Sequence, residues 1–336
     1  MNSISGILAF LSRGTRASAC LSRRNISPSR CLILHSPSSL MSTCAKSTVV
    51  PRPSASCVII NSKNEVLLVH RNPQARSFAG VHVFPGGNDS AQDGGDRRIT
   101  AIRETFEESG LLLASGPTPS DTILDAGRQA IHAGKTKFHA FLAEHGLTAD
   151  VQALLPFTQW ITPVGPPRRF HTHFFITFLG GASSSGFTSG AKEDRIPKPD
   201  GGQEVIAARF VRPEAVIAEF RVGKITLMPP QFYILTTLSS ILKGDATTRE
   251  ERARVEELAR GAFGRMVINP RQLPGAPDAE GRYVLTYETD EARGGPQGRL
   301  HRAVVRSGKG GVTHEITLHR NFDIFTEVDV GASSKL

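Results

Sequence analysis

An acidic, helix-forming segment that follows a glycine-rich turn constrains this chain more than any other feature. Residues 84–87 are FPGG, and residues 102–111 are IRETFEESGL. At about 100° per residue, a helix over 96–113 that is stopped by Gly110 places apolar side chains on one side and carboxylates on the other. The apolar side is formed by Ile99, Ile102 and Phe106, and the acidic side by Glu104, Glu107 and Glu108.

These clustered carboxylates repel one another, so we expect a positive charge among them. Oxygen ligands of this kind are preferred by hard cations, and the pattern therefore indicates a Mg²⁺ or Mn²⁺ site. Such an ion also favours the phosphate oxygens of a substrate. The alternative interpretation is a solvated acidic helix face that holds no metal.

The spacing of these residues resembles the Nudix box, whose family pattern is G-x5-E-x7-R-E-U-x-E-E-x-G-U with U apolar. The matching residues are Arg103, Glu104, Glu107, Glu108, Gly110 and Leu111. The first half of the pattern departs from the family. Asp93 stands where Glu is expected, nine residues instead of seven separate it from Arg103, and Thr105 replaces an apolar residue. We interpret Gly94-Gly95 as a two-residue loop insertion, which leaves open whether Asp93 or Asp96 replaces the first Glu.

The resemblance implies a fold and a set of catalytic roles. The implied fold is an α/β class, Nudix-type α/β/α sandwich with a mixed sheet. The implied metal ligands and catalytic residues are Glu104, Glu107 and Glu108, and Arg103 is expected to orient one of these carboxylates by a charge-assisted hydrogen bond. Family members often use a further acid from outside the box. Glu204 is our candidate for that ligand, with a plain surface carboxylate as the alternative.

The segment upstream of the box predicts the substrate. Residues 67–87, LLVHRNPQARSFAGVHVFPGG, resemble the signature L-L-T-x-R-[SA]-x3-R-x3-G-x3-F-P-G-G of the coenzyme A diphosphatase branch, with Val69 and Asn72 as the differences. The implied substrate-binding residues are Arg71, Arg76, Gly80, Phe84, Pro85, Gly86 and Gly87. Arginines suit bidentate contact with phosphates, and glycines allow close approach of the backbone. The alternative is that both arginines are ordinary surface charges.

A third resemblance covers the middle of the chain. The segments WITP at 160–163, PRRF at 167–170, FF at 174–175 and PPQ at 229–231 are similar to the eukaryotic peroxisomal subgroup of acyl-CoA diphosphatases. Arg168 and Arg169 are candidates to contact phosphate or adenine, with a solvated turn as the alternative. His171 and His173 alternate along a strand, and we interpret them as ordinary strand residues because a hard cation prefers the glutamates.

The pattern of strands and helices predicts the domain organisation. We expect a leader at 1–47 and a Nudix hydrolase domain at 52–242 that contains a helical insert at about 114–155. A connector at 243–280 and a C-terminal β-rich extension at 281–330 follow.

The charge of the chain is concentrated in its leader. The net charge is +9, but residues 1–64 carry eight of the forty basic residues and no acid, so the remainder carries 32 basic against 31 acidic residues, or +1. A nucleic-acid partner is therefore not expected. The longest apolar run is far shorter than the roughly 20 residues that span a bilayer, so no membrane span is expected.

Both ends carry features of targeting signals. The Ser- and Arg-rich leader resembles a mitochondrial transit peptide, with a basic N-terminal tail as the alternative. The final tripeptide, Ser334-Lys335-Leu336 at 334–336, is the signal read by the peroxisomal import receptor. We therefore expect the peroxisome as a location, and the mitochondrion as a second one when translation starts at Met1 rather than Met41.

The resemblance implies metal-dependent hydrolysis of the diphosphate of CoA or acyl-CoA to 3′,5′-ADP and (acyl-)4′-phosphopantetheine. One alternative is a Nudix hydrolase for another nucleoside diphosphate derivative, such as ADP-ribose or a dinucleotide. A second alternative is a non-catalytic Nudix module that binds nucleotides.

Overall fold

The computed structural model describes residues 49–74, 79–179, 200, 204–308 and 311–328. The leader at 1–47, Arg76 and the tripeptide at 334–336 lie outside the described residues. Predictions that rest on those segments stay predictions.

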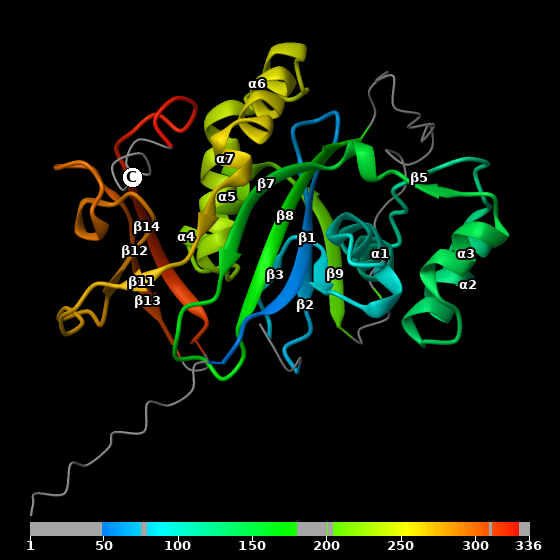
Figure 1. The fold of residues 1–336 in the computed structure, drawn as a ribbon, viewed down its shortest axis with the longest axis horizontal. Helices are drawn as coiled ribbons and strands as arrows, with labels where there is room; N and C mark the ends of the chain where they lie inside the picture. The colour runs from blue at the N-terminus through cyan, green and yellow to red at the C-terminus, as the bar shows by residue number, and fades with distance from the viewer. Residues whose placement is uncertain (1–48, 75–78, 180–199, 201–203, 309–310, 329–336) are drawn as a thin grey trace, which may run out of the picture. The chain divides into compact units, whose positions relative to one another are not determined.

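A mixed β-sheet of eight strands forms the centre of the fold (Figure 1). Its strands are β1 (Arg52–Ile60), β2 (Val66–Arg71), β3 (His82–Val83), β4 (Gly86–Asn88), β7 (Leu155–Ile161), β8 (Phe170–Phe178), β9 (Val205–Val211) and β10 (Val267–Ile268). Their order is β10-β7-β8-β1-β2-β3, while β4 also pairs with β1 and β9 with β2. The β1–β8 and β7–β10 pairs are parallel and the other pairs antiparallel. The predicted α/β class with a mixed sheet is confirmed.

One face of this sheet is covered by α1 (Arg97–Ser109) and by the helices that follow it. Alternate residues of β1, namely Ala55, Cys57 and Ile59, face α1 and pack with its buried Ile102 and Phe106. Two helices, α2 (Asp121–His132) and α3 (Phe138–Glu144), occupy the range in which a helical insert is expected. Short elements connect this layer: η1 (Ala91–Asp93), β5 (Ala114–Ser115), β6 (Thr148–Ala149) and η2 (Val151–Ala153).

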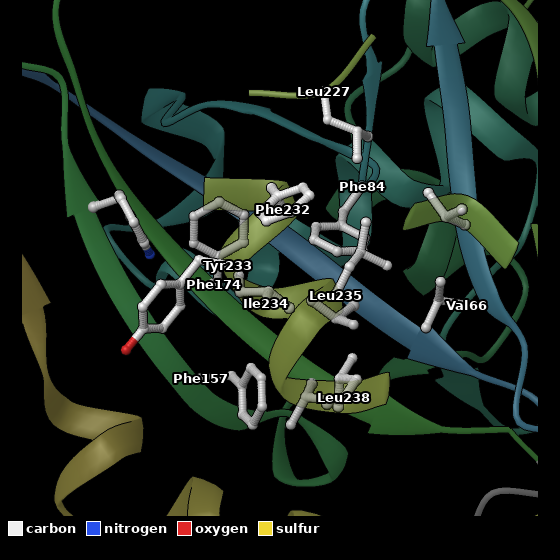
Figure 2. Packing of buried hydrophobic residues seen from close by; sticks show 14 of the residues in the cluster. Val66, Phe84, Phe157, Phe174, Leu227, Phe232, Tyr233, Ile234, Leu235 and Leu238 are labelled. Carbon is white, nitrogen blue, oxygen red and sulfur yellow. The ribbon is translucent and has the colours of Figure 1, made fainter. Parts of the chain in front are cut away.

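The opposite face is covered by α4 (Pro213–Arg221), α5 (Pro229–Ile241), α6 (Arg249–Arg260) and α7 (Ala262–Arg265). Figure 2 shows the α5 side chains Phe232, Tyr233 and Leu235 among sheet residues such as Phe157 and Phe174. Successive residues 231–235 of α5 are buried, which is the pattern of a helix enclosed on several sides.

A second sheet covers the outer side of α5 and is formed by β11 (Arg271–Gln272), β12 (Tyr283–Thr286), β13 (His301–Ser307) and β14 (Thr313–Arg320), with η3 (Glu291–Arg293) between β12 and β13. Its buried residues, such as Leu285 and Val305, belong to the same hydrophobic cluster as α5. The segment expected as a connector at 243–280 contributes Val255 and Phe263 to that cluster, and its β10 strand joins the main sheet. This segment is therefore part of the packed interior.

Within the described residues, no helix has the length and apolar character needed to cross a bilayer. Cys57 is buried in the α1-facing cluster, and burial raises the pKa of its thiol well above the usual range. Such a thiol is chemically unreactive.

Candidate active site

Helix α1 holds its glutamates at defined positions because both of its ends are capped. The Asp96 side chain accepts a hydrogen bond from Arg98 N at the first turn, and Gly110 ends the helix with a left-handed φ of 74°. The apolar side of the helix is fixed on the sheet by Ala101, Ile102 and Phe106. The acidic side consequently faces the glycines of β4.

The glycines of β4 allow the carboxylates to approach the backbone closely. A Cβ on Gly87 would lie 2.4 Å from the carboxylate of Glu104, and one on Gly86 would lie 2.4 Å from the Ala55 carbonyl oxygen. Gly86 N also donates a hydrogen bond to Glu108 Oε2 at 3.0 Å. Gly87 is therefore required where Glu104 of α1 meets β4, and Gly86 is required where β4 pairs with β1.

Arg103 is buried at the centre of the acidic cluster. Its Nε and Nη2 atoms donate to Asp93 at 2.8 and 2.9 Å, and Nη1 lies 2.9 Å from both Glu104 Oε1 and Glu107 Oε1. Burial on its own lowers the pKa of Arg103, but the hydrogen bond to Asp93 and the charge of Glu104 outweigh burial and raise it. Arg103 therefore stays charged and orients two of the glutamates.

The structure distinguishes the two aspartates that the sequence left open. Asp93 is 3% exposed and is the partner of Arg103, whereas Asp96 caps α1 and pairs with Arg98. Gly94 and Gly95 have φ values of 63° and 80° and form the turn between η1 and α1. The loop insertion therefore keeps an acid in contact with Arg103.

Arg71 connects Glu108 with Glu204. Its Nη1 lies 3.0 Å from Glu108 Oε1 and its Nη2 lies 3.4 Å from Glu204 Oε2. The Glu108 side chain is 3% exposed and the Glu204 side chain 54%. The structure thus brings Arg71 and Glu204 to the acidic side of α1, and their roles in binding substrate and metal stay predictions.

The donor set of this site fits a hard divalent cation. Burial, supported by the charge of Glu107, raises the pKa of Glu104 to about 7 although Arg103 opposes the change. Burial and the charge of Glu104 raise the pKa of Glu108 to about 8 against the opposing effect of Arg71. Oxygen ligands whose negative charge is destabilised in this way gain most from a bound cation.

A cation would require some rearrangement. Within the described residues, no three acidic, imidazole or thiol side chains are already arranged around one metal position. Arg103 Nη1 accounts for this, because it holds one oxygen each of Glu104 and Glu107. Each of these carboxylates keeps a second oxygen that Arg103 does not hold and that an ion could use.

The helical insert also contacts Glu107. His132 Nδ1 of α2 lies 3.7 Å from Glu107 Oε2, and Arg128 Nε donates a hydrogen bond to the Glu107 carbonyl oxygen at 2.8 Å. The sequence did not reveal these two residues as part of the site. An Arg and a His four residues apart on a helix share one face, but that spacing alone does not tell which element the face contacts.

Phe84 and Pro85 are placed away from the site. The Phe84 side chain is 1% exposed and packs edge-on against Phe174 in the α5-facing cluster. Pro85 is buried, and its carbonyl oxygen accepts hydrogen bonds from Cys57 N and Ser56 Oγ. Both side chains are buried, and the substrate-binding role expected for these two residues stays a prediction.

Arg169 is also occupied elsewhere. Its guanidinium donates to the carbonyl oxygens of Thr162, Pro163 and Val49 and is largely buried, so it stabilises the turn between β7 and β8. The prediction that Arg169 contacts phosphate or adenine stays a prediction. Arg168 is exposed in the same turn, and its role stays a prediction.

Two further sequence features have clear positions. Gly80 has a φ of 69°, and its carbonyl oxygen accepts a hydrogen bond from Thr226 Oγ1. His171 and His173 lie on β8 with ring centroids 4.8 Å apart, and His171 Nε2 is 2.9 Å from Gln159 Oε1. Their interpretation as strand residues on one face is confirmed.

Comparison with known proteins places this geometry in a family. A model of the NUDT19 Nudix domain matches residues 95–238, and a model of the NUDIX domain matches residues 50–127. Acyl-coenzyme A diphosphatase NUDT19 of Gallus gallus is 25% identical over 349 residues, which cover 81% of this chain and 86% of the relative.

Other similar proteins match over a shorter length. Putative nudix hydrolase 7 of Caenorhabditis elegans is 30% identical over 203 residues, which cover 57% of this chain and 62% of that protein. The crystal structure of a NUDIX hydrolase from Alicyclobacillus acidocaldarius superimposes with a TM-score of 0.47 at 24% identity, over 57% of this chain and 92% of that one.

Proposed function

The chain belongs to the Nudix hydrolase family, and from that membership we propose that it hydrolyses the diphosphate bond of coenzyme A or acyl-coenzyme A. Family membership makes it a Nudix diphosphatase. The proposed products are 3′,5′-ADP and 4′-phosphopantetheine or its acyl derivative. One observation carries the proposal. Arg71, from the segment that resembles the CoA signature, forms an ion pair with Glu108 of the box, with Arg71 Nη1 3.0 Å from Glu108 Oε1.

Divalent metal ions are general cofactors of Nudix hydrolases, and when bound they neutralise diphosphate oxygens and lower the pKa of a coordinated water. Glu104, Glu107 and Glu108 would hold Mg²⁺ or Mn²⁺ here, because their carboxylates share one side of α1. Arg103 keeps two of these carboxylates oriented, and its own position is fixed by Asp93. Water adds to one phosphorus, the bridging P–O bond breaks, and the net reaction releases a proton.

Arg71 would supply the substrate contact. A charged guanidinium at the edge of the carboxylate cluster can exchange a carboxylate partner for a phosphate of the substrate. Gly86 and Gly87 let the Glu108 and Glu104 carboxylates lie against the backbone of β4, since neither glycine carries a side chain. Glu204, which also pairs with Arg71, is the proposed further metal ligand.

The named relatives favour the coenzyme A substrate. The Gallus gallus protein, matched along 86% of its length, is described as an acyl-coenzyme A diphosphatase, and so is the protein of Homo sapiens, 30% identical over 39% of its length. The competing substrates are ADP-ribose and dinucleotides, which share the diphosphate but differ in what it joins.

Turnover of CoA, a short- and a long-chain acyl-CoA and ADP-ribose in the presence of Mg²⁺ or Mn²⁺ tests the proposal. We expect kcat/KM for a CoA substrate to exceed that for ADP-ribose. The reverse order would overturn the CoA assignment, and binding of CoA without turnover would favour a non-catalytic module.

Variants separate the metal site from the substrate contact. We expect Glu107→Gln to lower kcat about 100-fold or more, since several kcal/mol of charge stabilisation are lost. Arg71→Ala should lower kcat/KM for CoA about 10-fold or more, whereas Arg209→Ala should leave it unchanged. Arg209 is a matched control, because it lies on the neighbouring strand β9 and pairs with Glu219 of α4. Full activity of Glu107→Gln would refute the metal assignment.

A further inference from the structure

The helical insert contacts the catalytic segment at both ends, and we propose that it positions the metal-binding carboxylate of Glu107. In this proposal Arg128 and His132 of α2 are positioning residues for the reaction. The inference rests on the proposed function in one respect, the assignment of Glu107 to the metal site.

Arg128 holds the backbone at Glu107. The last carbonyl groups of a helix have no partner within the helix, and the carbonyl of Glu107 is one of these in α1. Arg128 Nε donates to it at 2.8 Å, and the Arg128 side chain is only 7% exposed. A guanidinium at the C-terminal end of a helix is also favoured by the helix dipole. The insert therefore supplies the cap that fixes the last turn of α1.

Gly110 makes room for that cap. Its φ of 74° is left-handed, and a Cβ at this position would lie 3.3 Å from Arg128 Nη1. A glycine of the box thus meets two requirements, because it ends α1 and admits the arginine of the insert.

His132 lies beside the carboxylate of Glu107. It lies four residues after Arg128, so both side chains point from the same face of α2 toward α1. Glu107 Oε1 is 2.9 Å from Arg103 Nη1, and Glu107 Oε2 is 3.7 Å from His132 Nδ1. The imidazole is too far away for a direct hydrogen bond, so it acts as a wall that limits the orientations open to the carboxylate. Arg103 from the box and His132 from the insert enclose it between them.

The other end of the insert contacts the start of the catalytic segment. Phe138 N of α3 donates a hydrogen bond to Gln92 Oε1 at 3.1 Å, and Gln92 precedes Asp93, the partner of Arg103. Phe141 of α3 also stacks on Phe106 of α1 with ring centroids 5.6 Å apart. The insert therefore acts on Glu107 in two ways. Its own His132 lies beside the carboxylate, and its contact with Gln92 supports Asp93, the partner of Arg103.

Metal affinity measured without substrate tests this proposal. Calorimetric titration of the full chain with Mn²⁺ alone is compared for wild type, His132→Ala, His132→Gln and His139→Ala. Groups that orient a metal ligand typically change affinity 10- to 100-fold when removed, and a wall at 3.7 Å should lie at the low end. We expect the Mn²⁺ Kd of His132→Ala to rise about 10-fold and that of His132→Gln to rise much less. His139 is the matched control, because it is exposed on α3 of the same insert.

Variants of Arg128 form the second part of the experiment. Arg128→Ala should raise the Mn²⁺ Kd about 10- to 100-fold and speed hydrogen exchange of the amides at the end of α1. Arg128→Lys, which keeps the charge but not the geometry of the guanidinium, should give a smaller change in both. If Arg128→Ala does not fold, the Mn²⁺ affinities of Arg128→Lys, His132→Ala and His132→Gln still test the proposal.

Kinetics must agree with the titration. In the folded variants kcat should fall and the metal concentration for half-maximal activity should rise, while KM for CoA stays within about 2-fold. Mn²⁺ affinities of His132→Ala and Arg128→Lys equal to that of His139→Ala would overturn the proposal. A wild-type chain that binds Mn²⁺ but hydrolyses no diphosphate would instead refute the proposed function and leave this inference standing.

Discussion

The α1 face of the main sheet buries a cluster of charged side chains beside its apolar core, whereas the α5 face is packed with aromatic side chains. Asp93 of η1 and the α1 residues Arg103 and Glu108 are each less than 5% exposed. On the other face Trp160 and Tyr233 pack edge-on with ring centroids 5.5 Å apart, and each also packs against Tyr287. The same strands contribute to both faces, because alternate residues point to opposite sides.

The two faces have different energetic roles. Charges taken out of water carry a desolvation penalty that their mutual attraction offsets only in good geometry, so the buried charges of the α1 face contribute little to stability. Aromatic burial is favourable in itself and gains from edge-on contacts. We infer that the α5 face and the C-terminal sheet supply the stability that the charged site does not. Substitutions on the two faces should consequently separate stability from activity.

The largest separation is expected from a matched pair of phenylalanines. Phe263→Ala on α7 removes a ring that is 1% exposed and contacts Phe157 and Tyr233, so it should lower the free energy of unfolding by about 3–5 kcal/mol. The kcat of the molecules that remain folded should be unchanged. Phe106→Ala on α1 should lower stability by a similar amount and kcat as well, because the helix carries the glutamates. Urea unfolding and kcat at low temperature measure both effects, and equal losses of kcat in the two variants would contradict the distinction.

A pair of glycines gives the reciprocal test with a smaller effect. Gly87→Ala places a Cβ 2.4 Å from the Glu104 carboxylate and should lower kcat about 100-fold, or about 2.7 kcal/mol, by displacing that ligand. Its free energy of unfolding should stay within about 1 kcal/mol of wild type, because a flexible side chain can move away. Gly264→Ala places a Cβ 1.8 Å from the Ala259 carbonyl oxygen in α6 and should cost about 1–3 kcal/mol of stability with kcat unchanged. The idea fails if Gly264→Ala impairs kcat as much as Gly87→Ala.

Sequence reasoning worked where function fixes both residue type and spacing. The position of the glutamates on α1 and the need for glycine at 86 and 87 follow from local geometry, and the structure places them together. The direction of the Phe84 side chain could not be predicted, because a family signature fixes spacing but not side-chain direction. Phe84 lies between β3 and β4 and packs into the α5-facing cluster.

Other parts could not be predicted because they depend on contacts between distant segments. Arg169 is taken up by carbonyl groups of the turn and of Val49, which no local pattern reveals. Arg128 and His132 act across the space between two helices. The segment expected as a connector has a charged sequence, yet Val255 and Leu258 share one side of α6 and, together with Phe263 of α7, complete the α5-facing core.

The smallest expected effect is a dependence of stability on pH that belongs to the α5 face. His301 of β13 is fully buried, its Nδ1 is 2.6 Å from the Glu288 carbonyl oxygen and its Nε2 is 2.9 Å from Tyr233 Oη. Burial lowers the pKa of His301 to about 4; the charges of Arg320 and Arg299 act in the same direction, and the Glu288 bond and Asp290 oppose them.

Because the pKa is lower in the folded state than its ordinary value of 6.5, the unfolded chain takes up the proton first as the pH falls. Stability should therefore decline between about pH 6.5 and 4, by on the order of 2 kcal/mol from this residue between pH 8 and pH 5. His301→Gln should reduce that decline, measured as the difference in urea unfolding between the two pH values. Part of the decline should remain in this variant, because the pKa values of His82 and His173 are also lowered to about 4, mainly by burial. His319→Gln, an exposed histidine of the same sheet, should leave the decline unchanged, and an identical decline in His301→Gln would show that the α5 face is not the source.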